Sequence, residues 1–143
     1  MPSFTSLRTA IKAKLDTLTG TGQPLKQVKD SHDENFTGFP VATFEPSGHE
    51  NNFYLNTDNQ RAYAFDIIVW QEMPSGGRNN AITVLAAAVD AIVSAFDADY
   101  SLGGACDFCV PIPSAWGDVV IGNSSFKYAK MSIVCKSEVL VTT

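Results

Sequence analysis

Hydrophobic residues near the start of the chain recur with the spacing of an amphipathic helix. These apolar positions are Phe4, Leu7, Ile11, Leu15 and Leu18. Charged residues fall elsewhere around the helical wheel, so the pattern predicts a helix over residues 3–18. Ser3 has the side chain of an N-cap residue, and Gly20 is suited to end the helix.

A second helical pattern lies in residues 81–104, which read AITVLAAAVDAIVSAFDADYSLGG and are apolar nearly all round. Asn79 or Asn80 is placed to cap its start. The bulky side chains form a stripe that is expected to face a sheet: Ile82, Leu85, Val89, Ile92 or Val93, and Phe96. A second stripe carries smaller side chains: Val84, Ala88, Ala91 and Ala95.

The small-residue stripe lets another backbone come close, and two partners are open to it. The N-terminal helix is one, because two helices on the same sheet face commonly pack together. A second copy of the protein is the other, since large exposed apolar patches are rare on monomers and usually mark interfaces. The second face of the sheet is open to the same interpretation. The stripe residues are therefore our candidate subunit-interface residues.

Alternating apolar and polar residues predict strands in the rest of the chain. The predicted strands span residues 25–30, 40–46, 61–71, 105–113 and 126–141. In the strongest, 61–71, one face carries Tyr63, Phe65, Ile67 and Val69, and the other carries Ala64, Ile68 and Trp70. Both faces are partly apolar, which predicts a central strand.

Three further features refine this picture of the strands. The last strand places Ala129, Met131, Ile133 and Cys135 on one face. Lys127 shares that face near the strand's end, where we expect it to reach solvent. Prolines at both ends of 40–46 indicate a sheet edge or a strand end, and Gly122–Asn123 suits a hairpin turn.

The order of the elements is a helix, several strands, a helix and several strands. It lacks the regular strand–helix alternation of parallel folds. We therefore predict an α+β fold in a single domain, residues 1–143. Its antiparallel or mixed β-sheet should carry the two helices packed mainly on one face.

The 143-residue chain has a formal net charge of −5 and a pI near 4.8. This balance argues against a protein that grips phosphate backbones, although an acidic surface suits one that lets DNA slide past. The N-terminus lacks the features of a secretory signal, and the apolar helix is interrupted by Asp90 and judged too short to span a bilayer. We expect a cytosolic protein with no membrane contact, and its three cysteines fit a reducing compartment.

Candidate chemistry is sparse. Cys106 and Cys109, in CDFC, lie in a predicted strand that would point their thiols to opposite faces, and no further ligands complete a zinc site. The His- and acid-bearing segments 30–34 and 48–50 are read as solvated loops, and SGGR at 75–78 lacks the P-loop pattern. We predict no catalytic, cofactor or metal site, and a protein that is not an enzyme.

The arrangement resembles the tail terminator (tail completion) proteins of long-tailed bacteriophages. The resemblance covers most of the chain. It rests on the N-terminal helix, PVATFEP, the hairpin region into YAFDIIVWQE, the alanine-rich helix, ADYSLGG, and the terminal strand FKYAKMSIVCK. It implies a virion structural protein, made in the host cytoplasm, that forms a homo-oligomeric ring, a hexamer in that family.

In that family the ring caps the tail-tube protein, ends tube polymerisation and joins the tail to head-completion (neck) proteins, while DNA passes through the lumen without sequence-specific binding. The polar loops 46–60 and 72–79 would then be candidate docking elements for neighbouring rings. Their candidate docking residues are His49, Asn52, Tyr54, Met73 and Arg78.

Several rival functions remain open from the sequence. The nearest is another head–tail connector, neck or tail-tube subunit, although a tube protein should be richer in strands. A small ligand-binding α+β domain that uses a helix–sheet groove belongs to a different class. An enzyme that relies on Cys106 and Cys109, or on the His- and acid-bearing loops, is the third.

Overall fold

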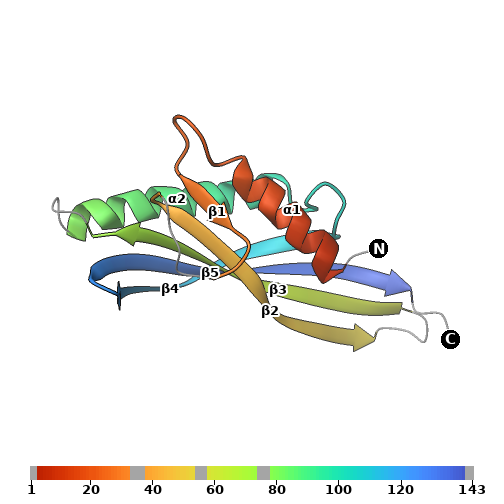
Figure 1. Ribbon diagram of the computed structural model, residues 1–143. Helices are drawn as coiled ribbons and strands as arrows, with labels where there is room; N and C mark the ends of the chain where they lie inside the picture. Colours follow the sequence, from red (N-terminus) through yellow and green to blue (C-terminus); the bar gives the residue numbers. More distant parts are fainter. Residues whose placement is uncertain (1–2, 33–37, 54–57, 74–77, 141–143) are drawn as a thin grey trace.

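The computed structural model describes residues 3–32, 38–53, 58–73 and 78–140, without the side chains of 49–60, 78, 139 and 140. The elements are α1 (Phe4–Asp16), β1 (Gln27–Lys29), β2 (Val41–Phe53), β3 (Asp58–Glu72), α2 (Arg78–Ala98), β4 (Phe108–Ile121) and β5 (Ser124–Leu140). In Figure 1 both helices lie on the same side of a long twisted sheet.

The described strands form one five-stranded sheet in the order β1-β2-β3-β5-β4. The short β1 pairs parallel with β2, and the other neighbouring pairs are antiparallel. Helix α1 contacts β1 and β2, whereas α2 contacts β3, β4 and β5. The α+β class, the mixed sheet and the placement of both helices on one face are thereby confirmed.

Local sequence explains where α1 begins and ends. The Ser3 side chain accepts a hydrogen bond from the Ser6 backbone N–H, and the Ser6 side chain accepts one from the Ser3 N–H, which together form a capping box. The helix ends at Asp16, two residues before the predicted end. Gly20 follows in the turn with a φ of 116°, a conformation that glycine adopts without strain.

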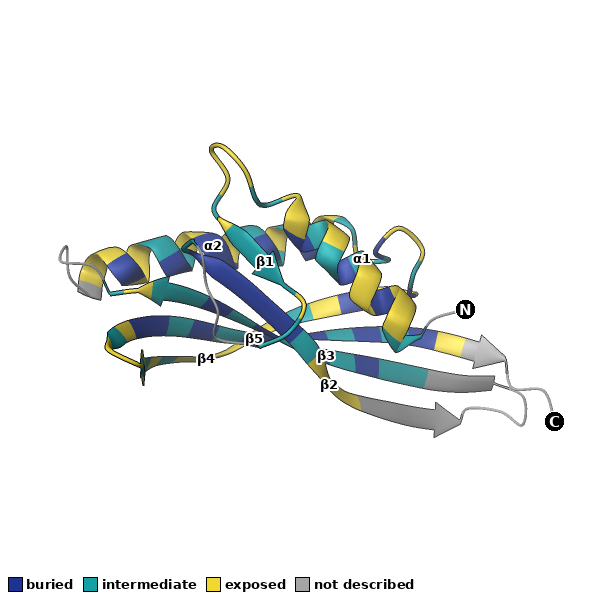
Figure 2. Cartoon of the chain, viewed as in Figure 1, coloured by how far each residue is buried: buried dark blue, intermediate teal, exposed yellow. Residues whose placement is uncertain are grey.

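The core lies between the sheet and the helices, as the buried positions in Figure 2 show. The alternation predicted for 61–71 and for the last strand is confirmed. The buried strand residues of the core cluster are Ala42, Phe44, Tyr63, Phe65, Ile67, Val69, Cys109, Ala129, Met131, Ile133 and Cys135. The buried helix residues that meet them are Leu7, Ile11, Leu15, Leu85, Ala88, Val89, Ile92 and Phe96.

Helix α2 differs from its prediction in two respects. Its bulky stripe is buried except at its first member, because Ile82 is 37% exposed and Ala81 faces the core instead. Residues 79–98 have a mean hydropathy of 1.8 and are long and apolar enough to cross a membrane, which corrects the expectation that the helix is too short. Core helices have the same composition, and α2 packs on the sheet.

Strands β2, β3 and β4 are longer than the alternation predicted, whereas β1 is shorter than the predicted strand 25–30. β2 continues to Phe53 and β3 starts at Asp58, so most of the predicted loop 46–60 is a hairpin of paired strands. β4 continues through a bulge between Pro113 and Ala115, and the hairpin turn at Gly122 is confirmed. Pairing with β5 along its whole length accounts for this extension.

The prediction that the Lys127 side chain reaches solvent is wrong. Its side chain is 9% exposed, and its Nζ atom lies 3.3 Å from Oδ1 of Asp118 on β4. The two residues are direct cross-strand partners, so the long β4 supplies the counter-charge.

Candidate subunit interface

The face of the sheet opposite the helices has no helix over it within the described residues (Figure 1). We call it the open face. Phe108, Val110 and Ile112 on β4 are paired with Lys136, Val134 and Ser132, which alternate along β5 with the buried Ile133 and Cys135. These three β4 side chains therefore lie on the open face.

Phe108, Val110 and Ile112 form an exposed apolar strip along the outermost strand of the sheet. Their side chains are 39%, 40% and 47% exposed, which is unusual for large apolar groups at every second position. Beyond the bulge, Trp116 and Val120 are also exposed but share the helix side with Ala129. We call Phe108, Val110 and Ile112 the apolar strip, and it is the strongest candidate for an interface.

Two prolines in β4 restrict how another chain can bind at the apolar strip. Pro111 and Pro113 lie within edge strand β4, and proline has no backbone N–H to offer to another strand. Prolines on an edge therefore hinder the addition of a strand from another chain. A partner would contact this region through the side chains of the open face rather than by extending the sheet.

A polar cluster occupies the β2–β3 part of the same face. Nε1 of Trp70 donates a hydrogen bond to Oγ1 of Thr43 at 3.0 Å, and Nδ1 of His32 lies 2.8 Å from the same oxygen. Thr43 is fully buried although it points away from the helices, so these side chains shield it. The Trp70 ring also packs 5.8 Å from the ring of Tyr128. This part of the open face is covered by the subunit itself.

The ring of His32 is held in its neutral form. Burial lowers its pKa below the ordinary value of 6.5, and Lys130 adds to that effect, whereas Glu45 and Asp66 raise it without reversing the direction. Nε2 of His32 lies 3.6 Å from Oε2 of Glu45, a contact that becomes an ion pair only when the ring is protonated. At neutral pH the His32 ring therefore makes a hydrogen bond with Thr43 rather than an ion pair with Glu45.

Acid is expected to reduce the contribution of the neutral His32 ring to the stability of the fold. Since the pKa of His32 is lower in the folded than in the unfolded chain, the unfolded chain binds the proton more tightly, and the free energy of unfolding falls as pH drops below about 6.5. The variant His32→Asn keeps an amide near Thr43 but does not titrate. Urea unfolding at pH 7.5 and pH 5 should show the stability advantage of the wild type over this variant becoming smaller at pH 5. A constant difference would contradict the prediction.

The four candidate interface residues on α2 do not share one environment. Ala88 is fully buried in the subunit core, so its side chain is not available to another copy. Val84, Ala91 and Ala95 are half-buried. The fully solvent-facing stripe of α2 lies beside them and consists of Thr83, Ala87, Asp90, Ser94 and Asp97. We call this the outer stripe of α2; Figure 2 shows exposed positions along this helix.

The candidate docking residues belong to two parts of the chain, the β2–β3 hairpin and the connection from β3 to α2. His49 and Asn52 lie in β2, and Arg78 is the first residue of α2, but their side chains are outside the described part of the structure. Tyr54 lies outside the described residues altogether. Met73 follows β3 and is half-buried, and its backbone N–H donates to the Ser125 carbonyl at 2.9 Å.

The cysteines gather in the core, which corrects the expectation of opposed thiols. Cys106 lies in the turn before β4 rather than in the strand, and its thiol hydrogen-bonds with those of Cys109 and Cys135. The bond with Cys109 lowers the pKa of Cys106, but the bond with Cys135 and burial outweigh it and raise the pKa to about 12. The pKa of Cys109 is also raised, by its hydrogen bond with Cys106 and by burial. These thiols stay protonated at neutral pH, which suits packing better than nucleophilic chemistry.

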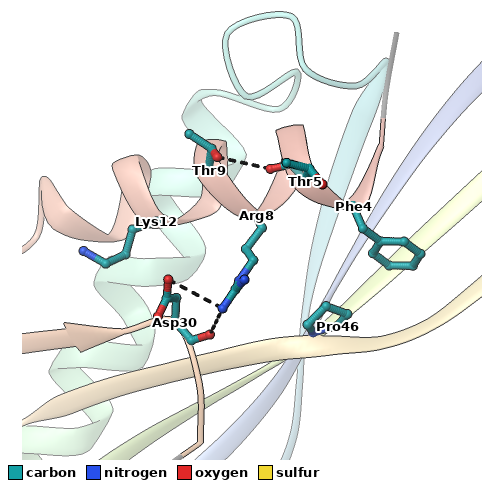
Figure 3. A pocket seen from close by; sticks show the side chains of 7 residues that line it. All are labelled: Phe4, Thr5, Arg8, Thr9, Lys12, Asp30 and Pro46. Carbon is teal, nitrogen blue, oxygen red and sulfur yellow. Dashed lines mark hydrogen bonds and ion pairs between the residues drawn. The ribbon is translucent and has the colours of Figure 1, made fainter.

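A hollow of about 390 Å³ lies between α1 and the β1–β2 edge (Figure 3). Nη2 of Arg8 points into it and lies 2.7 Å from the carbonyl oxygen of Asp30 and 3.5 Å from its Oδ2. Nζ of Lys12 is 2.9 Å from the Asp16 carboxylate. Both cations are therefore neutralised within the subunit, which weakens the case for an anionic ligand. Among the described residues, no group of three or more His, Cys, Asp or Glu side chains could hold a metal ion.

Sequence reasoning did not single out the apolar strip, although FCVPIP carries its signal. Large apolar residues at every second position, interrupted by prolines, are typical of an edge strand with one apolar face. No protein-family model matches this chain, and no curated protein matches it significantly. Interpretation of the surface therefore rests on its own geometry and chemistry.

Proposed function

We propose that this protein is a structural subunit that assembles with copies of itself into a ring, and that the ring is the tail terminator of a long-tailed bacteriophage. In this role it caps the tail tube, ends its polymerisation and joins it to the neck proteins, while DNA passes through the lumen. The proposal needs no catalytic residue, cofactor or membrane.

The exposed apolar strip is the observation that carries the proposal. Phe108, Val110 and Ile112 expose large apolar side chains at every second position on a face that no described helix covers. A hydrophobic side chain that becomes buried contributes about 1.5–3 kcal/mol, so a contact over this strip would favour association substantially. A small subunit whose sheet is covered on one side only is suited to assembly through its other side.

Charge supports the same function. A formal net charge of −5 disfavours tight binding of a phosphate backbone, as a passage for DNA requires. The basic groups on α1 are neutralised by neighbouring acids, as Arg8 and Lys12 show. No basic patch that would retain DNA is formed by these two residues.

The test is to introduce a charge into the strip. Ile112→Glu places a carboxylate in the proposed contact, where burying it without a partner costs several kcal/mol. We expect self-association to weaken at least about tenfold, because each 1.4 kcal/mol is a factor of ten in the dissociation constant. Analytical ultracentrifugation measures the effect, and Gln23→Glu, at an exposed position before β1, is the matched control.

Electron microscopy and tube-assembly assays then distinguish a tail terminator from a tail-tube subunit. Negative-stain images of the wild type should show rings, and addition to growing tail tubes should arrest them. A protein that polymerises into tubes by itself would instead be a tube subunit. A wild type that remains monomeric at all concentrations and never caps a tube would overturn the proposal.

A further inference from the structure

We propose that the outer stripe of α2 in one copy packs against the apolar strip of the next copy, with Asp90 and Asp97 of the first facing Lys136 of the second. This inference rests on the proposed self-assembly and names the two surfaces that meet. A second copy of the same chain therefore covers the open face, and it makes this contact with its helix layer.

The shapes of the two surfaces suit one another. The outer stripe of α2 has no side chain larger than aspartate or threonine, so the helix can approach a neighbouring surface closely. Phe108, Val110 and Ile112 supply the bulky groups that such a helix lacks. Because Pro111 and Pro113 hinder strand addition at this edge, a helix laid on the face fits better than an added strand.

Charge pairing within the subunit identifies the groups left for a partner. Lys14 is paired with Asp99 at 3.0 Å, Lys127 with Asp118 at 3.3 Å, and these cations need no other partner. By contrast, the carboxylates of Asp90 and Asp97 make no ion pair with any described residue, and both are exposed.

The matching cation, Lys136, lies beside the apolar strip on the neighbouring strand β5. The ammonium of Lys136 also lacks an ion pair within the described residues and sits 6.0 Å from the centre of the Phe108 ring. The two aspartates of the outer stripe of α2 are therefore complementary in charge to the lysine beside the apolar strip. Complementary charges make a contact specific for its partner and fix the orientation of the two surfaces.

The two surfaces lie on opposite sides of the subunit, one on the helix layer and one on the open face (Figure 1). A contact between two different surfaces is head-to-tail, so every copy keeps one free surface of each kind for the next. Contacts of this type build closed rings when the rotation between copies closes. The inference therefore agrees with a ring rather than with an isolated symmetric dimer.

The experiment exchanges the charges. Lys136→Glu alone, and Asp90→Lys with Asp97→Lys, should each weaken self-association at least about tenfold, because like charges would then face each other. The variant with all three substitutions should recover most of the wild-type association. Ultracentrifugation gives the association constants, and circular dichroism verifies that each variant is folded.

A second measurement works on the wild type itself. A zero-length carbodiimide reagent, applied to a mixture of isotopically light and heavy protein, should join Lys136 of one copy to Asp90 or Asp97 of another. Mixed-isotope peptides mark the links between copies. This readout does not depend on the folding of any variant.

The outcomes separate the inference from the proposed function. A monomeric wild type overturns both. A wild type that forms rings, whose association is unchanged by the single exchanges and whose cross-links lie elsewhere, overturns this inference alone. The inference is supported if self-association weakens when the charge is reversed on one surface only and recovers in the variant with all three substitutions. The expected mixed-isotope cross-link supports it as well.

Discussion

Replacing Phe65 by alanine is expected to lower the free energy of unfolding by about 3–5 kcal/mol, the usual cost of emptying a buried phenylalanine site. Phe65 is fully buried on the central strand β3. Its ring centre lies 5.7 Å from that of Phe4 on α1 and 6.4 Å from that of Phe44 on β2. The substitution therefore removes contacts to a helix and to a neighbouring strand together. Urea unfolding followed by circular dichroism measures the loss.

Phe108→Ala is the matched control for this prediction. It deletes the same ring from a position that is 39% exposed and packed on one side only. Measured on the monomer, below the concentration of self-association, it should cost less than about half as much, because less apolar surface returns to water and no closed cavity forms. Equal losses for the two variants would show that the core between sheet and helices is not organised as described.

The second large effect concerns the pair of Lys127 and Asp118. Asp118→Ala leaves the largely buried ammonium of Lys127 without its ion-pair partner. Removing one partner of a fully buried pair costs about 3–5 kcal/mol, and since Asp118 is 44% exposed we expect about 1–3 kcal/mol here. Chemical denaturation at neutral pH measures the change.

Lys127→Met distinguishes an electrostatic from a packing origin. It fills the same site with an apolar side chain and removes one ion pair from the partly exposed carboxylate of Asp118. We expect a loss smaller than that of Asp118→Ala, or a small gain, because replacing a buried charge by an apolar group is often neutral or stabilising. A larger loss for Lys127→Met would mean that the ion pair itself stabilises the fold strongly.

Local patterns in the sequence determined the elements and their inward faces. The three- and four-residue spacing of Leu7, Ile11 and Leu15 placed α1, and the alternation of Phe65 with Ile67 placed β3 and its buried side. Such patterns are readable because side-chain direction repeats with the backbone period in a helix or a strand. The α+β class followed from the order of these elements.

Which positions remain exposed depends on how the elements pack. The pattern of the chain predicts that Phe108, Val110 and Ile112 alternate in a strand, but not that this strand is an edge or that their face lacks a helix among the described residues. Likewise Ala88 reads as part of a small-residue stripe, and its burial depends on how α2 is rotated over β3 and β5. Strand order and helix rotation depend on contacts between residues far apart in the chain, and local periodicity carries no information about them.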